Sequence, residues 1–151
     1  MENQFDILKK NRALLLKVID GLSIDQLNKI PEGFKNNIAW NVAHVVVTQQ
    51  LLCYKLSSLP LDVSREMVEE FMKGAAPTKD VSQEEFDEII ALLKQLPEKL
   101  EEDYNKGVFK SYSEYTTSVN VTLTNVDEAI NFNNFHEGIH LGVVLALRKL
   151  V

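Results

Sequence analysis

The chain of 151 residues is long enough for one domain with a buried core, and its 45% apolar and 25% charged residues are typical of a soluble globular protein. Its formal net charge of −6 argues against a nucleic acid or an anionic membrane as partner, because both require a basic surface. Residues 1–10 contain acidic side chains and lack the apolar stretch of a signal peptide, and no apolar run approaches the roughly 20 residues of a membrane span. Cys53 is the only cysteine, so no intrachain disulfide can form. We therefore expect a single cytoplasmic domain over residues 1–151.

A first long helix is predicted over residues 3–21, where apolar side chains recur at helical spacing. Gly21 can end it, since glycine tolerates the left-handed conformation in which many helices terminate. Lys9, Lys10 and Arg12 form the densest basic cluster of the chain, and a solvated face of this helix would explain that cluster.

A short helical turn is expected next, over residues 23–30, which Ser23 can cap and Pro31 ends. The second long helix should occupy residues 37–56. Its apolar stripe consists of residues three and four apart, namely Trp40, Ala43, His44, Val47 and Leu51.

Residues 61–79 then form a long connection with one short helix over residues 64–72. The capping box Ser82–Glu85 opens a third long helix, which should run over residues 82–107. Pro97 lies inside this pattern and should kink or briefly break the helix, because proline removes a backbone donor.

Residues 112–122 are rich in Tyr, Thr and Val and are predicted to be an extended connection. Its tyrosines, Tyr112 and Tyr115, could cover the mouth of a site. Thr124 with Asp127 is a weaker capping signal for the last long helix, residues 125–150. Four long helices joined by long polar connections indicate an all-α fold, a four-helix bundle.

Histidines are the residues of chemical interest. His136 and His140 are four positions apart, so their side chains lie one turn apart on one face of the last helix and can bind one metal ion. His44 is the only other histidine, and it should point from the second long helix into the bundle. The pattern predicts one divalent metal ion held by His44, His136 and His140. A buried histidine is often satisfied by hydrogen bonds alone, so a bundle without a metal is an alternative.

The same stretch matches the H-E-x-x-H pattern of zinc proteases, in which the glutamate is a general base. A protease is disfavoured here, because the chain is small and all-helical and no predicted strand could align a peptide. Glu137 points about 100° away from His136 on the helix. We therefore interpret Glu137 as a solvated or interface carboxylate, and Cys53 as a small buried apolar residue rather than a ligand.

Two stretches resemble the DinB/YfiT-like superfamily. The first is residues 36–44, Asn-Asn-Ile-Ala-Trp-Asn-Val-Ala-His, in which Trp40 precedes His44 by four positions; the second is residues 136–142, His-Glu-Gly-Ile-His-Leu-Gly. The order of the histidines along the chain also matches. The resemblance implies a DinB-like four-helix bundle, often a homodimer, whose three histidines bind a divalent metal such as zinc or nickel. It also implies that some relatives are transferases or isomerases that use low-molecular-weight thiols.

Three neutral imidazoles leave the charge of a divalent ion uncompensated and at least one coordination position open, as in a Lewis-acid site. The leading hypothesis is a metal-dependent enzyme acting on a small molecule, either a thiol-dependent transferase or a hydrolase. The alternative is a non-enzymatic metal-binding or dimeric scaffold protein with a structural or vestigial site, although a structural ion normally has four protein ligands. The pattern names no catalytic residue beyond the ligands.

Several neighbours of the histidines have two interpretations. Asn133 and Thr48 each lie one turn from a histidine, where they could orient the imidazoles or simply be polar residues at the edge of the core. Trp40 should pack beside the site. Gly138 and Gly142 each cost roughly 1 kcal/mol inside a helix relative to alanine. We therefore expect a close approach of another helix to both glycines, within the bundle or across a dimer.

Overall fold

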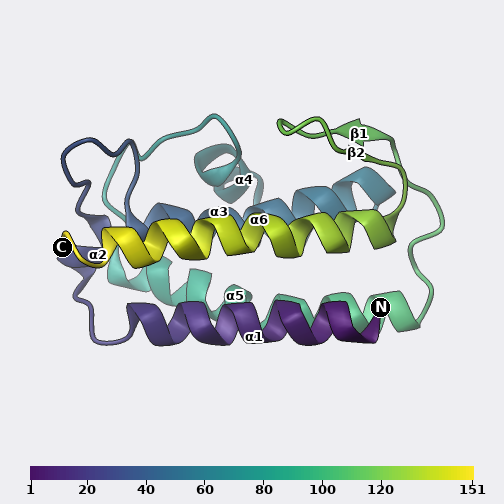
Figure 1. Ribbon diagram of the computed structural model, residues 1–151, viewed down its shortest axis with the longest axis horizontal. Coiled ribbons are helices and arrows are strands. Elements are labelled where there is room, and N and C mark those ends of the chain that lie inside the picture. The colour runs from purple at the N-terminus through teal and green to yellow at the C-terminus, as the bar shows by residue number, and fades with distance from the viewer.

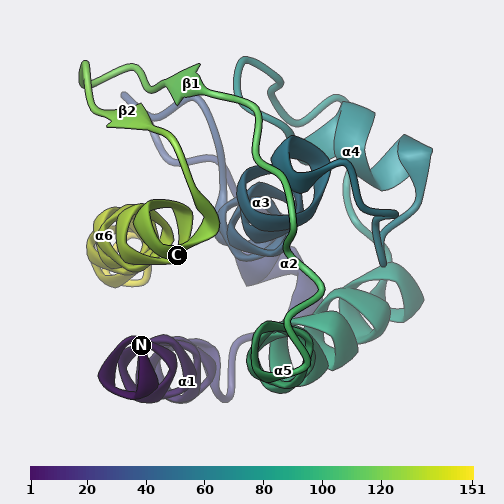
Figure 2. The same cartoon turned by 90° about the vertical axis from the view of Figure 1, so that its right-hand side faces the viewer.

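Four long helices lie side by side in the computed structural model, which describes residues 1–151 (Figure 1). They are α1 (Glu2–Ile19), α3 (Ile38–Gln49), α5 (Gln83–Asn105) and α6 (Val126–Leu147). Viewed along their axes they occupy the corners of a square (Figure 2), in which α1 and α3 are each in contact with both α5 and α6. The expected all-α four-helix bundle with long connections is confirmed.

Shorter elements lie in the connections. The helix α2 (Ile24–Asn28) follows α1, and α4 (Arg65–Phe71) lies against α3. The extended connection contains a small antiparallel hairpin of β1 (Tyr115–Thr116) and β2 (Thr122–Leu123), in which Tyr115 is opposite Leu123. This hairpin lies beside the N-terminal half of α6 (Figure 1).

A side-chain cap marks the start of every α-helix except α1. The capping box of Ser82 and Glu85 at the start of α5 is present as predicted. The predicted cap of the last helix is wrong by one residue, because Asn125 rather than Thr124 accepts from the backbone N–H of Glu128 at 3.0 Å. The carboxylate of Glu128, rather than that of Asp127, accepts from the backbone of Thr124.

The second long helix is not one α-helix over residues 37–56. It continues beyond α3 as a π-helical turn, η1 (Gln50–Tyr54), and a 3₁₀ turn, η2 (Lys55–Ser57). Two consecutive polar residues, Gln49 and Gln50, are both fully buried there. One amide donates to a backbone carbonyl of α5, and the other accepts from the backbone of the connection before α4. Each glutamine thus has a partner outside its own helix, whereas the side-chain nitrogen of Gln50 has none.

Pro97 does not interrupt α5, which is continuous across it. A residue at this position would normally donate its N–H to the carbonyl of Leu93, one turn earlier, and proline cannot. The guanidinium of Arg12, from α1, donates to that carbonyl at 3.1 Å instead. Arg12 is therefore buried in the bundle, and the expectation that it lies on a solvated face of the first helix is wrong.

The helix α3 is the most deeply buried element. All its residues except Thr48 are buried, because α5, α6, α2 and α4 surround it. Thr48 is partly open because it lines a cavity between α3 and α6. No helix of the protein combines the length and the apolar character needed to cross a membrane.

Candidate metal centre

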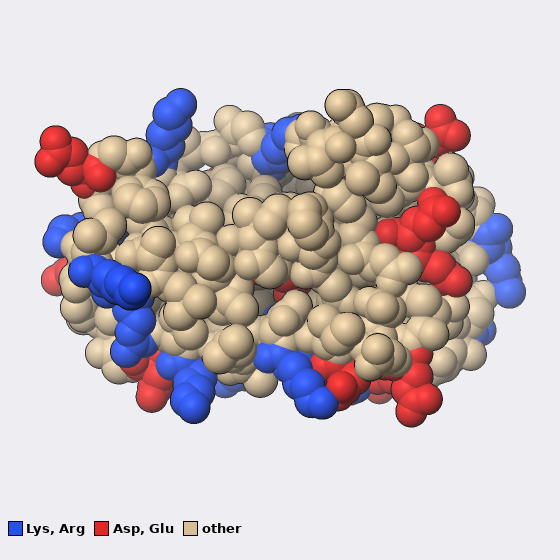
Figure 3. All heavy atoms as spheres, viewed as in Figure 1, with Lys and Arg blue, Asp and Glu red and all other residues tan.

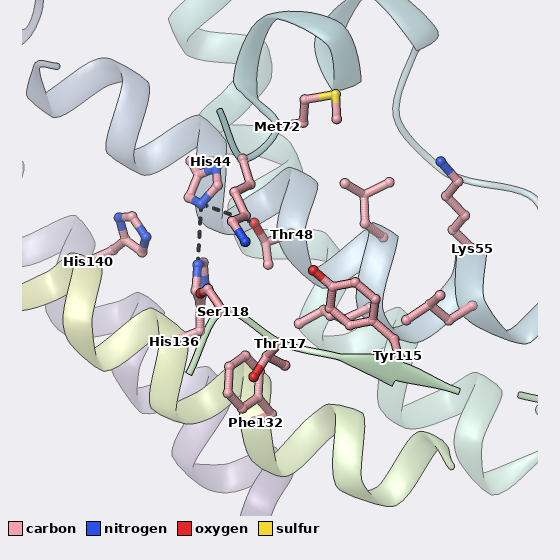
Figure 4. A pocket seen from close by; sticks show the side chains of 14 residues that line it. His44, Thr48, Lys55, Met72, Tyr115, Thr117, Ser118, Phe132, His136 and His140 are labelled. Carbon is pink, nitrogen blue, oxygen red and sulfur yellow. Dashed lines mark hydrogen bonds between the residues drawn. The ribbon is translucent and has the colours of Figure 1, made fainter. Parts of the chain in front are cut away.

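The three histidines meet between α3 and α6 at one end of a cavity (Figure 4). His44 comes from the middle of α3, and His136 and His140 project from successive turns of α6. One ring nitrogen from each lies within 4.8 Å of the others, and Nε2 of His44 is 3.3 Å from Nε2 of His136. The structure thus brings together all three histidines that the sequence singled out.

Two of the imidazoles are held in a defined orientation. Nδ1 of His44 donates to the backbone carbonyl of Phe71 at 2.6 Å, because a carbonyl oxygen can only accept. Nδ1 of His140 donates in the same way to the side-chain carbonyl of Asn41 at 2.8 Å. The amide of Asn41 is itself fixed, since its NH₂ group donates to Asn36 and to the backbone of Asn37. Both hydrogen bonds leave Nε2 with its lone pair free for a metal.

Burial keeps the three rings uncharged. Burial, together with a smaller effect of the neighbouring imidazoles, lowers the pKa of His136 to about 3 and that of His140 to about 4. The pKa of His44 is also lowered by burial, against the opposing effect of its bond to Phe71. At neutral pH all three are therefore neutral imidazoles, which is the form that binds metals.

The spacing of the ring nitrogens also fits a metal. Tetrahedral zinc with bonds of about 2.0–2.1 Å to nitrogen places two ligands about 3.4 Å apart, close to the 3.3 Å between the Nε2 atoms of His44 and His136. Nδ1 of His136 is buried without a hydrogen-bond partner. The three-histidine cluster fits a site for a metal ion, and imidazole ligands suit zinc and nickel alike.

Two neighbours of His44 complete its surroundings. Trp40 stacks on the imidazole with ring centroids 4.5 Å apart and an angle of 12° between the planes, as expected of a residue packed beside the site. The hydroxyl of Thr48 lies 3.3 Å from Nε2 of His44, where it can donate to that nitrogen.

Glu137 has a different place from the one expected of it. It is buried rather than solvated or at an interface, and its carboxylate forms an ion pair with Arg12 at 2.8 Å. Asn133 donates to the same carboxylate at 2.9 Å, so this asparagine orients Glu137 rather than His136. Glu137 is not among the residues that line the cavity, so it is not placed to act as the general base of a zinc protease.

Cys53 is the small buried apolar residue that the sequence suggested. It is fully buried, and burial raises the pKa of its thiol to about 12, with a smaller contribution from the carboxylate of Glu137. It is not part of the histidine cluster.

The cavity in front of the histidines has a volume of about 520 Å³. Its walls come from α3, η1, η2, α6, the hairpin, and the residues that follow α4 (Figure 4). Tyr115, Thr117 and Ser118 of the hairpin region line it, as predicted for Tyr115. Tyr112 does not line it, because its hydroxyl donates to the backbone carbonyl of Leu52 at 3.1 Å and the ring is held elsewhere.

The residues that orient the imidazoles were not identified from the sequence. Asn41 lies in the stretch that carries the family resemblance, and a polar residue on an otherwise apolar helix is a signal that could have singled it out. No feature of the sequence identifies the backbone carbonyl of Phe71 as a partner of His44, because the two meet only where α4 packs on α3.

Comparison with known proteins agrees with this geometry. No curated protein matches the chain. The sequence model of the DinB superfamily matches residues 7–144, a segment that includes all three histidines, the whole of α3 and α5, and most of α1 and α6. The chain belongs to the DinB superfamily.

Proposed function

We propose that this protein is a metal-dependent enzyme that acts on a small molecule, with His44, His136 and His140 as ligands of one divalent ion, zinc or nickel. The observation that carries the proposal is the position of three neutral imidazoles at one end of a cavity of about 520 Å³. A cavity of that size suits a small molecule. When bound, the ion would supply a Lewis acid that lowers the pKa of a thiol or of water.

Several residues of the chain would orient the ligands of such a metal site or border its cavity. Phe71 and Asn41 fix the rings of His44 and His140, and Thr48 places a hydroxyl at the edge of the cavity. We propose a low-molecular-weight thiol as one substrate, so that the reaction is a thiol transfer, with a hydrolase as the second possibility. A reducing cytoplasm would keep such a thiol reduced, which is consistent with a chain that has one buried cysteine.

The test is the metal content of purified, untagged protein, measured by elemental mass spectrometry. We expect close to one zinc or nickel ion per chain, and its loss when His44, His136 and His140 are all changed to Ala. The variant Lys17→Ala, at an exposed position of α1, is the matched control and should keep its metal. Metal-loaded protein would then be assayed with thiols and electrophiles. A protein that takes up no ion after incubation with zinc and nickel contradicts the proposal, and metal without turnover contradicts the enzymatic part alone.

We further propose that the protein forms a homodimer through the outer face of α6. The exposed residues of α6 from Asn131 to Ala146 include no charged side chain, and Phe135 and Ile139 are 52% and 47% exposed. Figure 3 shows this as a broad uncharged band across the front of the molecule. A side chain at Gly138 or Gly142 would meet no atom of the protein within 4 Å, so the glycines do not serve a close approach inside the bundle.

The order of residues on this face matches an antiparallel copy of itself. A two-fold axis between Gly138 and Ile139 places these two residues against each other across the interface, and it places Phe135 against Gly142 of the second copy. Large side chains then face glycines. The same register brings Glu128, in the first turn of α6, opposite Lys149 of the second copy, just beyond the helix end. A self-complementary face of this kind is what a two-fold dimer requires.

A further inference from the structure

The cavity beside the histidines differs in charge from the rest of the molecule. The chain contains 22 acidic and 16 basic residues. The cavity is nevertheless lined by two lysines, Lys55 and Lys73, and by no aspartate or glutamate. Its side chains therefore have a formal charge of +2 with the histidines neutral, inside a protein of net charge −6.

Neither lysine is neutralised by another group of the protein. Lys55 and Lys73 take part in no ion pair, whereas Lys79 and Lys99, in the same part of the molecule, each contact two carboxylates. Lys55 comes from η2 and Lys73 follows α4, so two separate elements contribute a cation to the same space. Low-dielectric walls focus the field of such charges and attract an anion.

The distance between Lys55 and the histidines indicates the shape of the molecule that fits. Lys55 lies eleven positions after His44 along a nearly continuous helix, which places their backbones roughly 16 Å apart. Figure 4 shows the side chain of Lys55 across the cavity from the three histidines. The wall between these two ends is largely apolar and is formed by Leu51, Leu52, Leu56, Met72 and Phe132.

We propose that the cavity binds an elongated anionic small molecule with an apolar middle. Its anionic group is held by Lys55, its apolar part lies along the leucine wall, and its other end reaches the histidines, while Lys73 adds a second positive charge to the cavity. The role of this molecule as substrate rests on the proposed function. Its binding does not, because the lysines and the apolar wall belong to the chain itself.

The test uses protein from which metal has been removed with a chelator, so that an anion cannot bind through an ion. Octanoate, octan-1-ol and octylammonium have the same apolar chain with a negative, zero and positive charge. Each is titrated into the protein and followed by two-dimensional NMR. We expect octanoate to shift the signals of cavity residues and to bind roughly fivefold or more tightly than octan-1-ol, with octylammonium weakest.

Variants then locate the anionic end. Lys55→Met should weaken octanoate binding roughly fivefold while leaving octan-1-ol binding unchanged, and Lys73→Met should have a smaller effect of the same kind. Lys94→Met removes an exposed, unpaired lysine of α5 outside the cavity and should change neither. If Lys55→Met is unfolded by circular dichroism, Lys55→Gln replaces it.

Two outcomes overturn the inference. The first is that octanoate and octan-1-ol bind equally tightly, or that neither binds. The second is that the Lys55 and Lys94 variants lose the same amount of octanoate affinity. Metal content is measured separately on each sample before chelation. If a protein that takes up no metal binds octanoate through its lysines, the proposed function is overturned and this inference stands. If the protein takes up metal but does not bind octanoate, this inference is overturned and the proposed function stands.

Discussion

Glu137 and Arg12 form an ion pair between α6 and α1 that is almost completely removed from water, with side chains only 3% and 2% exposed. Removing two charges from water costs several kcal/mol for each ion, and the cost is offset only when both find good partners. Arg12 also donates to the side chain of Gln49 at 2.6 Å and to the backbone of α5, and Asn133 donates to Glu137. Removing either member would therefore leave the other buried without a counter-charge.

Changing Glu137 to Gln should lower the free energy of unfolding by about 3 kcal/mol or more, because the guanidinium of Arg12 would remain buried without a counter-charge. Urea denaturation of metal-free protein measures the effect. Glu66→Gln removes the same charge from an exposed, unpaired position on α4 and should stay within about 0.5 kcal/mol of the parent protein. Equal effects of the two substitutions would show that the buried pair adds no stability.

The sequence predicts which residues of one helix share a face, but it does not predict which residues of different helices are in contact. His136 and His140 are four positions apart, so a shared face follows from helical geometry alone. Glu137 and Arg12 are separated by 125 positions, and an isolated charge in a sequence is normally solvated. Nothing local distinguishes this carboxylate or this guanidinium from its exposed neighbours, which is why both were placed in solvent.

The two faces of helix α6 differ in character. Its inner face carries two of the three histidines and Glu137, and its outer face is uncharged and exposed. A helix that is apolar on its outer side is typical of an interface. The proposed dimer is therefore a property of this one element, and it can be tested without touching the histidines.

Ile139→Glu should convert a dimer to a monomer, because the proposed two-fold axis would place two carboxylates against each other in an apolar interface. Sedimentation velocity measures the mass of the particle. Leu14→Glu makes the same kind of change at a similarly exposed residue of α1, 46% exposed against 47%, and should leave the dimer intact. A parent protein that sediments as a monomer, or equal behaviour of the two variants, would exclude the α6 interface.

The start of a helix could be predicted where a side chain caps it, but irregularities within a helix could not. Ser82 with Glu85 marked the start of α5 correctly, since a capping box is a local pattern. At the π turn Gln50 bonds the backbone of the connection before α4, and the carbonyl of α5 that Pro97 leaves free is bonded by Arg12 of α1. Propensities that consider each helix in isolation therefore predict neither the π turn nor the continuity of α5.

The whole molecule should respond to acid through its histidines. Below pH 6.5 the histidines of the unfolded chain take up protons, whereas those of the folded, metal-free protein do not until pH reaches about 4 for His140 and about 3 for His136. The unfolded state thus binds more protons in this window. The free energy of unfolding should fall as pH is lowered from 6.5 to 4, by up to about 1.4 kcal/mol per pH unit for each such histidine.

Denaturation of chelator-treated protein at several pH values measures this slope. The double variant His136→Gln and His140→Gln lacks both groups and should have a much flatter profile between pH 6.5 and 4.5, whatever its absolute stability. Carboxylates with lowered pKa values, such as Glu85 and Asp103, contribute mainly below about pH 5 and do so equally in both proteins. Parallel profiles for the two proteins would contradict the assignment of the acid response to the histidines.

The division of the cavity between two kinds of element has a consequence for how this protein could diversify. Its histidine end rests on α3 and α6, where nearly every neighbour is packed and a substitution would be felt throughout the core. Its opposite end includes Lys55 of η2 and Tyr115 of β1, which are exposed residues of connecting segments, where replacement is better tolerated. Gene duplicates could therefore acquire new ligand preferences by exchanging distal residues such as Lys55 or Tyr115, while the three histidines and their helices are inherited unchanged.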